Sequence, residues 1–140
     1  KRKGILVFTR FLKEAERLTM SIPGCVIVSG DTPKKERERI LEMFKTGEIP
    51  VVANVGVLTT GFDYPELDTV VMARPTMSLA MYYQIVGRCI RPYKGKTAWF
   101  VDLCGNINRF GEVSDLHLKD TGNGKWAVFS KGRQLTNVRF

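Results

Sequence analysis

The chain has 140 residues, of which 44% are hydrophobic, so it is long enough for one domain with its own core and too short for two. Its 22 Lys and Arg against 14 Asp and Glu give a formal charge of +8. This excess favours a polyanionic partner, with nucleic acid the leading candidate and a merely solvated basic surface the alternative. Cys25, Cys89 and Cys104 form no CxxC pair, and their odd number argues against a disulfide framework or a zinc site.

No apolar run approaches the length of about 20 residues that crosses a bilayer. The basic start at Lys1, Arg2 and Lys3 leads into a strand pattern, where a signal peptide would have a small-residue cleavage site. We therefore expect no membrane partner and a reducing, intracellular setting, cytoplasmic or nucleoid-associated, with a phage-encoded protein also compatible. Because the chain begins without methionine, we also expect that it is cut from a longer polypeptide.

Apolar runs and helical repeats alternate along residues 5–103, which predicts an α/β fold with a mainly parallel sheet flanked by helices. In chain order we expect a strand at 5–8, a helix from 11 that stops at 23–24, a strand at 25–28, a helix at 33–45, a strand at 50–53, a loop at 54–63, a strand at 69–73, a helix from 77 or 78 to 91 and a strand at 97–103. Sites in such sheets lie beyond the carboxyl ends of the strands, where we expect the loops of Ser29, Thr59 and Asp63.

Two of the expected helices carry apolar stripes. The first should bury Phe11, Ala15 and Leu18 on one face. In the last, Leu79, Tyr82, Tyr83 and Val86 form the stripe, so we interpret both tyrosines as core residues and not as a platform for stacking bases.

The helix at 33–45 has clear end signals, with Thr32 as a candidate N-cap, Pro33 at the first helical position and Gly47 as the stop. Its residues 34–39 mix both charge signs in the run KKERER. We interpret this run as a solvated, salt-bridged face and not as a binding site.

The character of the chain changes beyond Cys104, where five glycines interrupt the sequence and only 125–130 and 135–140 have strand patterns. Trp126 and Phe129 alternate with basic residues and could stack bases. A β-hairpin that packs its aromatic side chains onto the domain is the better interpretation. We therefore divide the chain into a domain at 1–104 and a short β-rich C-terminal extension at 105–140.

One amide and two guanidiniums gather on one side of the last helix, through Gln84, Arg88 and Arg91, with Gly87 among them. Arginine forks suit phosphate oxygens, an amide can orient water or phosphate, and a glycine lets a ligand come close. Taken alone, the run is equally compatible with an ordinary solvated helix face. The preceding segment at 57–71, with the sequence VLTTGFDYPELDTVV, favours the phosphate site.

The two segments resemble motifs V and VI of the superfamily 2 helicases and translocases, and the opening ILVFTR at 5–10 resembles motif IV. The resemblance spans roughly residues 4 to 104 and implies a RecA-like three-layer domain. In that family two such domains clamp ATP between them, and this chain looks like the second. Cys89 and Ile90 depart from the small pair that many relatives carry between the two arginines, which affects only local packing.

The resemblance implies that Arg91 is the arginine finger that reaches the γ-phosphate, with Arg88 beside it. Gln84 would hold the γ-phosphate or the attacking water. Gly61, Asp63 and Gly87 would contribute to nucleotide binding, with Asp63 near the ribose or near the arginines.

The resemblance also implies a nucleic-acid interface. Thr59 or Thr60 would donate a hydroxyl to a phosphate. The other expected contacts follow the first two strands, at Thr9, Arg10, Ser29 and Gly30.

No GxxxxGK[ST] motif and no Asp-Glu dipeptide occur in the chain, so the groups that bind the β-phosphate and magnesium in this superfamily are absent. Gly95-Lys96-Thr97 imitates the end of such a motif but precedes a strand, where the motif must precede a helix. We expect ATP and Mg²⁺ to be bound mainly by an N-terminal RecA-like domain of the same protein. We also expect negligible ATP hydrolysis by this chain alone.

Two other functions stay open, a non-catalytic basic α/β module that binds nucleic acid and a small self-contained phosphotransferase. For the motor, DNA is favoured over RNA, because a motif VI headed by Gln84 looks more like that of DNA helicases than like the His-Arg version of the RNA-processing DEAD-box proteins. His117 should be a surface or packing residue, and Asp102 a hydrogen-bonded carboxylate and not a catalyst.

Overall fold

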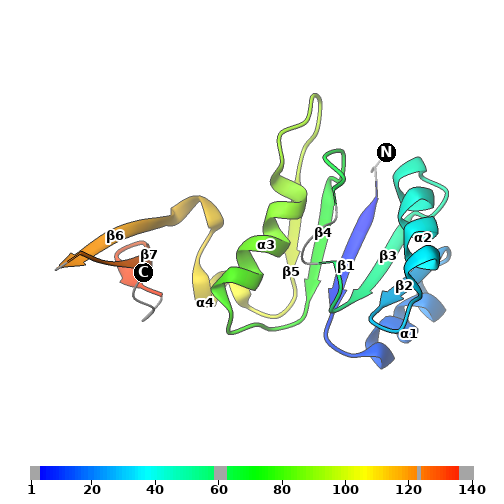
Figure 1. Cartoon of the computed structure of the whole chain (residues 1–140), viewed down its shortest axis with the longest axis horizontal. Helices are drawn as coiled ribbons and strands as arrows, with labels where there is room; N and C mark the ends of the chain where they lie inside the picture. Colours follow the sequence, from blue (N-terminus) through cyan, green and yellow to red (C-terminus); the bar gives the residue numbers. More distant parts are fainter. Residues whose placement is uncertain (1–3, 59–62, 123, 136–140) are drawn as a thin grey trace.

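The protein is described by a computed structural model that covers residues 4–58, 63–122 and 124–135, with Trp126 described through its backbone alone. Its centre is a five-stranded parallel sheet in the order β2-β3-β1-β4-β5 (Figure 1). The strands are β1 (Ile5–Thr9), β2 (Cys25–Ser29), β3 (Val51–Val55), β4 (Thr69–Ala73) and β5 (Trp99–Asp102). The sheet confirms the α/β fold expected from the sequence.

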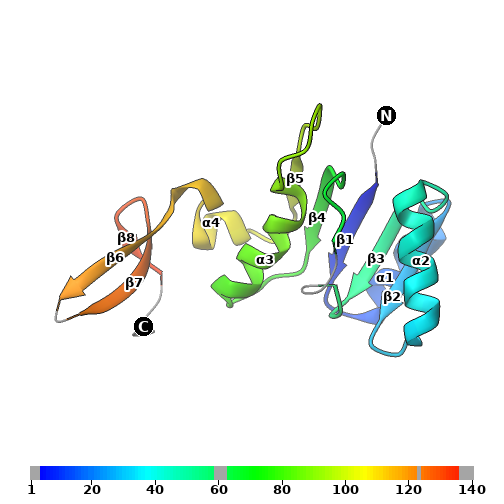
Figure 2. The same ribbon diagram turned by 45° about the horizontal axis from the view of Figure 1, so that its top comes forward.

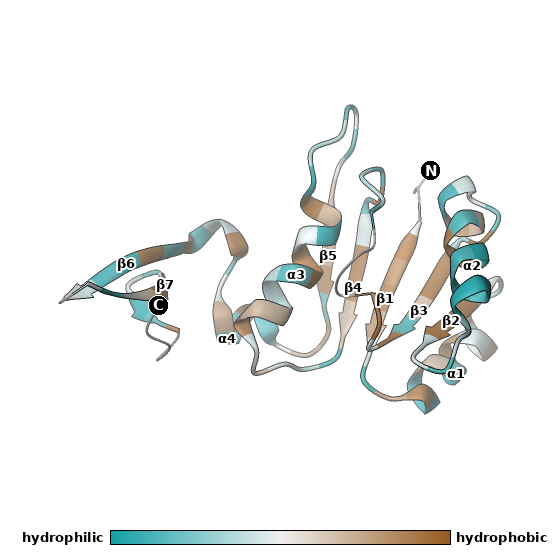
Figure 3. Cartoon of the chain, in the orientation of Figure 1, coloured by the Kyte–Doolittle hydropathy of each residue, from teal (hydrophilic) through white to brown (hydrophobic). Residues whose placement is uncertain are grey.

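The middle of the sheet is apolar on both faces, as its continuous hydrophobic runs predict. β1 lies between β3 and β4, with Leu6 paired to Val52 on one side and to Val70 on the other, and all three residues are fully buried. In Figure 3 the central strands are brown, whereas the outward side of the neighbouring helix α2 (Lys34–Thr46) is teal. The hydrophobic effect therefore holds this sheet as the middle layer of the domain.

Helices cover the two faces unequally. Ile40 and Phe44 of α2 pack with Tyr82 and Ile85 of α3 (Leu79–Ile90) in one large core cluster. On the opposite face α1 (Leu12–Ser21) is the one helix among the described residues, with Ala15 in a smaller cluster. Figure 2 shows α1 behind the sheet and α2 and α3 in front of it. The fold is thus a three-layer sandwich.

Helices flank both faces as expected, but the face beside α1 is only partly covered at β5. Trp99 and Val101 of β5, followed by Leu103, point away from α3 and are 51%, 37% and 65% exposed. Phe100 lies between them in sequence, faces α3 and meets the ring of Tyr82 edge-on at 6.1 Å. The alternation of a strand assigns each residue to one face, but it does not say whether a helix covers that face.

The first helix begins one residue later than expected, and its first aromatic residue is not in the core. Phe11 is the N-cap residue and is exposed, while Ala15 is buried and Leu18 half-buried. The Glu14 carboxylate closes the helix start by accepting hydrogen bonds from the backbone N–H groups of Arg10 (3.0 Å) and Phe11 (3.1 Å).

The start of α2 also differs from the expectation. Pro33 is itself the N-cap residue, and the Thr32 hydroxyl accepts from the Ser29 N–H at 3.0 Å, so it holds the preceding loop and does not cap the helix. Gly47 ends the helix as expected, in the left-handed conformation with φ of 89°.

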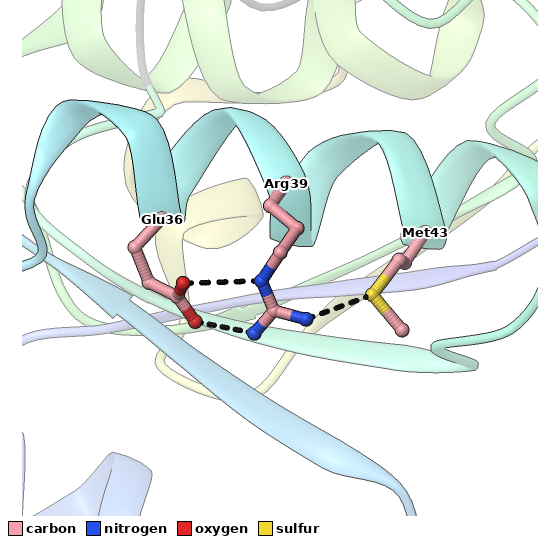
Figure 4. A network of polar contacts seen from close by, with 3 residues as sticks. All are labelled: Glu36, Arg39 and Met43. Atoms are coloured by element: carbon pink, nitrogen blue, oxygen red, sulfur yellow. Dashed lines mark hydrogen bonds and ion pairs between the residues drawn. The ribbon is translucent and has the colours of Figure 1, made fainter.

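The charged run of α2 forms the predicted salt-bridged face. Arg39 Nε and Nη2 donate to the two oxygens of Glu36 at 3.1 and 2.5 Å, and Arg39 Nη1 contacts Met43 Sδ at 3.3 Å (Figure 4). This contact between neighbouring turns keeps the guanidinium on the surface of its own helix.

The two tyrosines of α3 differ in burial. Tyr82 is buried, stacks on Phe110 at 5.2 Å and donates its hydroxyl to the Gly111 carbonyl at 2.8 Å. Tyr83 is 57% exposed, so its interpretation as a core residue was wrong. Ile85, Val86 and Cys89 take the remaining buried positions of the helix. Adjacent helical residues point about 100° apart, so Tyr83 leaves the face that Tyr82 turns toward the sheet.

The C-terminal part contains α4 (Asn106–Phe110), a 3-10 turn at Val113–Asp115 and a three-stranded antiparallel sheet that lies beyond α4, away from the parallel sheet (Figures 1 and 2). Its strands are β6 (Leu116–Gly122), β7 (Lys125–Ser130) and β8 (Arg133–Gln134). The sequence did not predict β6, because its side chains are exposed and lack an apolar alternation.

The strand expected at 125–130 is present as β7, which pairs antiparallel with β6 and with β8. The ring of Phe129 in β7 stacks on His117 of β6, with 6.2 Å between the ring centres. His117 is an exposed packing residue, as expected. Residues 136–140, in the expected last strand, lie outside the described residues.

Candidate nucleotide and nucleic-acid sites

The direction of the strands separates two groups of candidate residues. Because α3 connects two parallel strands, it begins beside the carboxyl end of β4 and ends beside the amino end of β5 (Figure 1). The Ser78 hydroxyl caps its start by accepting from the Met81 N–H at 3.2 Å. Pro92 ends α3, because a proline disfavours the helical conformation in the residue before it. Arg91 accordingly has φ of −55° and ψ of 132°. Arg91 therefore lies at the amino end of the sheet.

At this end the structure brings Arg91 and Asp63 together across 28 residues of sequence. Arg91 Nη1 donates to Asp63 Oδ1 in an ion pair between side chains that are 46% and 74% exposed. An exposed pair of this kind is worth about 0–1 kcal/mol. The contact therefore orients the guanidinium without binding it tightly.

Arg88 lies one turn before the helix end and is half-buried. Burial lowers the pKa of its guanidinium, the positive charge of Arg91 lowers this pKa further, and Asp63 opposes both effects. Arg88, Arg91 and Asp63 thus share this corner, where the two positive charges repel each other and Asp63 offsets part of that repulsion.

The two other motif VI residues lie on the same helix. Gln84 is exposed one turn before Arg88. A Cβ added at Gly87 would meet no described atom within 4 Å, so this side of the helix is open to an approaching group.

The segment that carries Asp63 is held in place by the chain that follows α3. Lys96 Nζ donates to the Pro65 carbonyl at 2.9 Å, and the Tyr93 hydroxyl donates to Glu66 Oε1 at 3.2 Å. Sequence reasoning gave Lys96 and Tyr93 no role. Lys96, in the Gly95-Lys96-Thr97 run before β5, therefore has a structural role in this contact.

The position of Asp63 corrects one prediction. Asp63 belongs to the segment before β4, at the amino end of the sheet, and not with Ser29 at the carboxyl end. The long connection between β3 and β4 starts at one end of the sheet and returns to the other, and sequence order alone does not show where it turns. Thr59, Thr60 and Gly61, which belong to the same connection, lie outside the described residues.

The carboxyl ends of β1 and β2 carry the other candidates. Thr9 is buried and its hydroxyl donates to the Asn54 carbonyl at 3.4 Å, so this side chain links two strands and faces away from solvent. Arg10, the next residue, is exposed, with its guanidinium 5.1 Å from the centre of the Phe11 ring. Ser29 is half-buried and accepts from the Asp31 N–H at 3.3 Å, and Gly30 is exposed.

A residue that the sequence did not single out supports the loop after β3. Asn54 is fully buried, and its Oδ1 accepts from the N–H groups of Val57 (3.2 Å) and Leu58 (3.0 Å). These bonds turn the chain sharply at the start of the motif V segment. The signal in the sequence was an amide inside an otherwise apolar strand.

Neither a metal centre nor a membrane span is found in the described part of the chain. Its His, Cys, Asp and Glu side chains form no group of three that could hold a metal ion. None of its helices is long and apolar enough to cross a bilayer. Cys25 and Cys89 are buried free thiols, and Cys104 is a partly exposed one.

Comparison with known proteins identifies the family and the fold. The helicase conserved C-terminal domain matches residues 1–93. The chain is 39% identical over 87 residues to the putative ATP-dependent helicase IRC3 of Saccharomyces cerevisiae. The aligned segment covers 62% of this chain and 12% of that protein. It is 32% identical over 105 residues to the DNA 3'-5' translocase XPB2 of Sulfurisphaera tokodaii, covering 74% and 23% of the two chains. The chain thus spans less than a quarter of the length of either relative.

Among solved structures, that of a hypothetical ATP-dependent RNA helicase from Sulfolobus tokodaii superimposes with a TM-score of 0.62 at 25% identity, over 74% of this chain and 31% of that one. The RecA-like fold expected from the motifs is therefore confirmed. The family match extends from the first strand to the residues just after α3, and so includes motifs IV, V and VI. The chain belongs to the helicase conserved C-terminal domain family of the superfamily 2 helicases.

Proposed function

We propose that this chain is the second motor domain of an ATP-dependent helicase or translocase and supplies Arg91 as an arginine finger to a nucleotide held mainly by a first RecA-like domain. The observation that carries the proposal is the contact of Arg91 with Asp63 beside half-buried Arg88, at the end of α3. Negative charge shifts on the phosphoryl oxygens during phosphoryl transfer, and cations already in position stabilise that state.

The residues at this corner fit a polyphosphate. Arg88 and Arg91 offer forked donors, Gln84 offers an exposed amide, and Gly87 leaves space for close approach. The Asp63 carboxylate is held by Arg91, so Mg²⁺ would find its oxygen ligands on the nucleotide and on the first domain.

The Arg91–Asp63 pair also suggests how the finger waits for its substrate. Since an exposed ion pair contributes about 0–1 kcal/mol, a phosphate oxygen can replace Asp63 as the partner of Arg91 at small cost. Asp63 would keep the guanidinium extended from the helix end until the domains close. Closure and reopening of the two domains would then couple ATP hydrolysis to movement on the nucleic acid.

We propose nucleic acid as the track, with DNA favoured over RNA on the Gln84-headed motif VI. IRC3, a putative ATP-dependent helicase, and XPB2, a DNA translocase by name, support a nucleic-acid motor. The similar solved structure is named for an RNA helicase, so the test has to compare both polymers. Contacts at Arg10, Ser29 and Gly30 would lie at the carboxyl ends of the strands, at the opposite end of the sheet from Arg91.

The test is ATP hydrolysis by this chain alone and by a polypeptide that joins it to its first RecA-like domain, with and without single- and double-stranded DNA and RNA. We expect negligible turnover by the chain alone and stimulated turnover by the longer protein, more by DNA than by RNA. Arg91→Ala in the longer protein should lower turnover by about 10³- to 10⁵-fold.

Arg39→Ala is the matched control, because it removes the same charge from the surface of α2 (Figure 4) and should leave turnover unchanged. Turnover that survives in Arg91→Ala would refute the finger. Turnover by the 140-residue chain would indicate a self-contained phosphotransferase. Tight, ATP-independent binding without turnover in either protein would favour the non-catalytic binding module.

A further inference from the structure

A basic pocket of about 250 Å³ lies at the carboxyl end of the sheet, away from the motif VI arginines. Arg10 follows β1, Arg74 follows β4 and Arg109 belongs to α4, so three segments far apart in sequence each place one guanidinium at its wall. Pro75, Thr76 and Met77 complete the described lining, which contains no acidic residue. Three like charges around one hollow repel one another unless an anion lies between them.

Arg74, the first pocket residue after β4, has a side-chain donor without a described acceptor. Its Nε is buried and has no hydrogen-bond partner within the described ranges. A buried guanidinium N–H without a partner costs free energy, so an acceptor that reaches it gains stability. An oxygen anion in the pocket offers the acceptor that this group lacks.

A network of buried polar contacts fixes the pocket wall. Asn106 is fully buried; its amide donates to the Arg74 carbonyl (3.0 Å) and to Asp102 Oδ1 (2.9 Å), and its Oδ1 accepts from the Thr76 N–H (2.9 Å). Arg109 Nη1 donates to the Thr76 carbonyl at 2.8 Å. The loop after β4 is therefore bound to α4 on both sides of Pro75, so the backbone of Arg74 and the guanidinium of Arg109 are positioned before any ligand arrives.

Two carboxylates near these segments are already engaged by other donors. Asp102 accepts from the Cys104 N–H (3.1 Å), the Ile107 N–H (2.7 Å) and Asn106, which agrees with its expected role as a hydrogen-bonded carboxylate. Glu14 accepts from the backbone of Arg10 and Phe11. The positive charge of the pocket is thus left available for a ligand.

We propose that the Arg10–Arg74–Arg109 pocket binds a backbone phosphate of the nucleic-acid strand and extends the contact line of Arg10 across the carboxyl end of the sheet to α4. A hollow of this size is smaller than the roughly 300–1,000 Å³ of pockets that enclose a drug-sized ligand, so it suits one phosphate group and not a whole nucleotide. Phosphate contacts of this kind fix the register of a strand without reading its sequence. The inference rests on the proposed function in taking nucleic acid as the ligand.

The test is the binding of a labelled oligo-dT and a labelled oligo-U to the 140-residue chain, by fluorescence anisotropy between about 50 and 200 mM salt. Arg74→Ala is the main variant, because only the backbone of Arg74 takes part in the network with Asn106. We expect about tenfold weaker binding. The slope of log affinity against log salt should shrink by about 0.7, the value of one lost phosphate contact on a single strand.

Three comparisons keep the result interpretable. Arg39→Ala removes the same charge from the outer face of α2 and should change neither affinity nor slope beyond error. Arg74→Lys should keep the slope and lose part of the affinity, since it retains the charge without the fork. Phenylglyoxal labels accessible arginines, and mass spectrometry of the unsubstituted protein locates the labels. The oligonucleotide should slow labelling at Arg10, Arg74 and Arg109, whereas inorganic phosphate at the same phosphate concentration should not.

Equal losses in Arg74→Ala and Arg39→Ala, with no protection of Arg74, would overturn the pocket and leave the proposed motor untouched, because the motor is judged by ATP turnover at Arg91. Equal protection by inorganic phosphate would overturn the assignment to nucleic acid. Absence of any oligonucleotide binding by the chain would overturn the inference as well, whatever the longer protein hydrolyses.

Discussion

Replacing Asn106 by Ala should test the polar network beneath the basic pocket most directly. The side chain is fully buried and serves two backbone groups of the loop after β4, the Thr76 N–H and the Arg74 carbonyl. It also supplies one of the donors that satisfy Asp102. Alanine removes all of these partners at once and puts no polar group in their place.

The structure gives the size of the effect. A buried polar group left without a partner costs about 1–3 kcal/mol. Thr76 is buried, so its N–H should bear the full cost, whereas half-buried Arg74 can recover a water molecule at its carbonyl. We therefore expect the free energy of unfolding to fall by about 2–4 kcal/mol, a large share of the roughly 5–15 kcal/mol that stabilises a typical domain.

Urea denaturation followed by circular dichroism measures this difference. Asn108→Ala is the matched control, because Asn108 is an exposed residue of the same short helix and its loss should change the free energy by less than about 0.5 kcal/mol. If the two variants unfold within about 0.5 kcal/mol of each other, the network does not hold the loop, and the argument for a pre-formed pocket fails with it.

Three further predictions concern the core and the glycine turns. Gly111→Ala should lower the free energy of unfolding by about 2–4 kcal/mol in thermal or urea unfolding, because Gly111 has φ of 84° and an added Cβ would overlap Ser130 Oγ. The control Gly95→Ala, with φ of 73° and no described atom within 4 Å of the added Cβ, should cost only about 1–2 kcal/mol, and equal losses in the two variants would exclude the clash. Burial raises the pKa of the Cys89 thiol from 9.0 to about 11, so this thiol ionises in the unfolded chain before it ionises in the folded one as the pH rises. The free energy of unfolding should therefore fall from pH 9 to 11 more steeply than in Cys89→Ala, and parallel plots of this free energy against pH would contradict the prediction. Iodoacetamide at mildly alkaline pH should label partly exposed Cys104 well before buried Cys89, as judged by mass spectrometry, and the reverse order would contradict the burial of Cys89.

The local sequence pattern was sufficient for the order of the main elements. Continuous apolar runs predicted the five parallel strands, since a strand buried on both faces needs no alternation. Gly47 and Pro92 marked the ends of two helices, because the first permits a left-handed residue and the second cannot continue a helix. The motif spacing also placed Gln84 and Arg88 on one helix without any tertiary information.

The sequence pattern failed where burial depends on a distant partner. Tyr82 and Tyr83 are equally apolar by composition, yet only the first faces the sheet and Phe110. The strand β6 has almost no apolar pattern and exists because β7 supplies its backbone hydrogen bonds. Helix and strand propensities describe neighbours in sequence and cannot report which segment supplies the other half of a contact.

The candidate sites divide in the same way. The sequence by itself determined the residue types, because forked guanidiniums suit phosphate at whatever position they occur. Only the tertiary structure decided that Asp63 pairs with Arg91 at the amino end of the sheet, and that Arg10, Arg74 and Arg109 meet at the carboxyl end. The reason is that strand order and the path of the long connection before β4 set these distances, and both arise from the packing of the whole core.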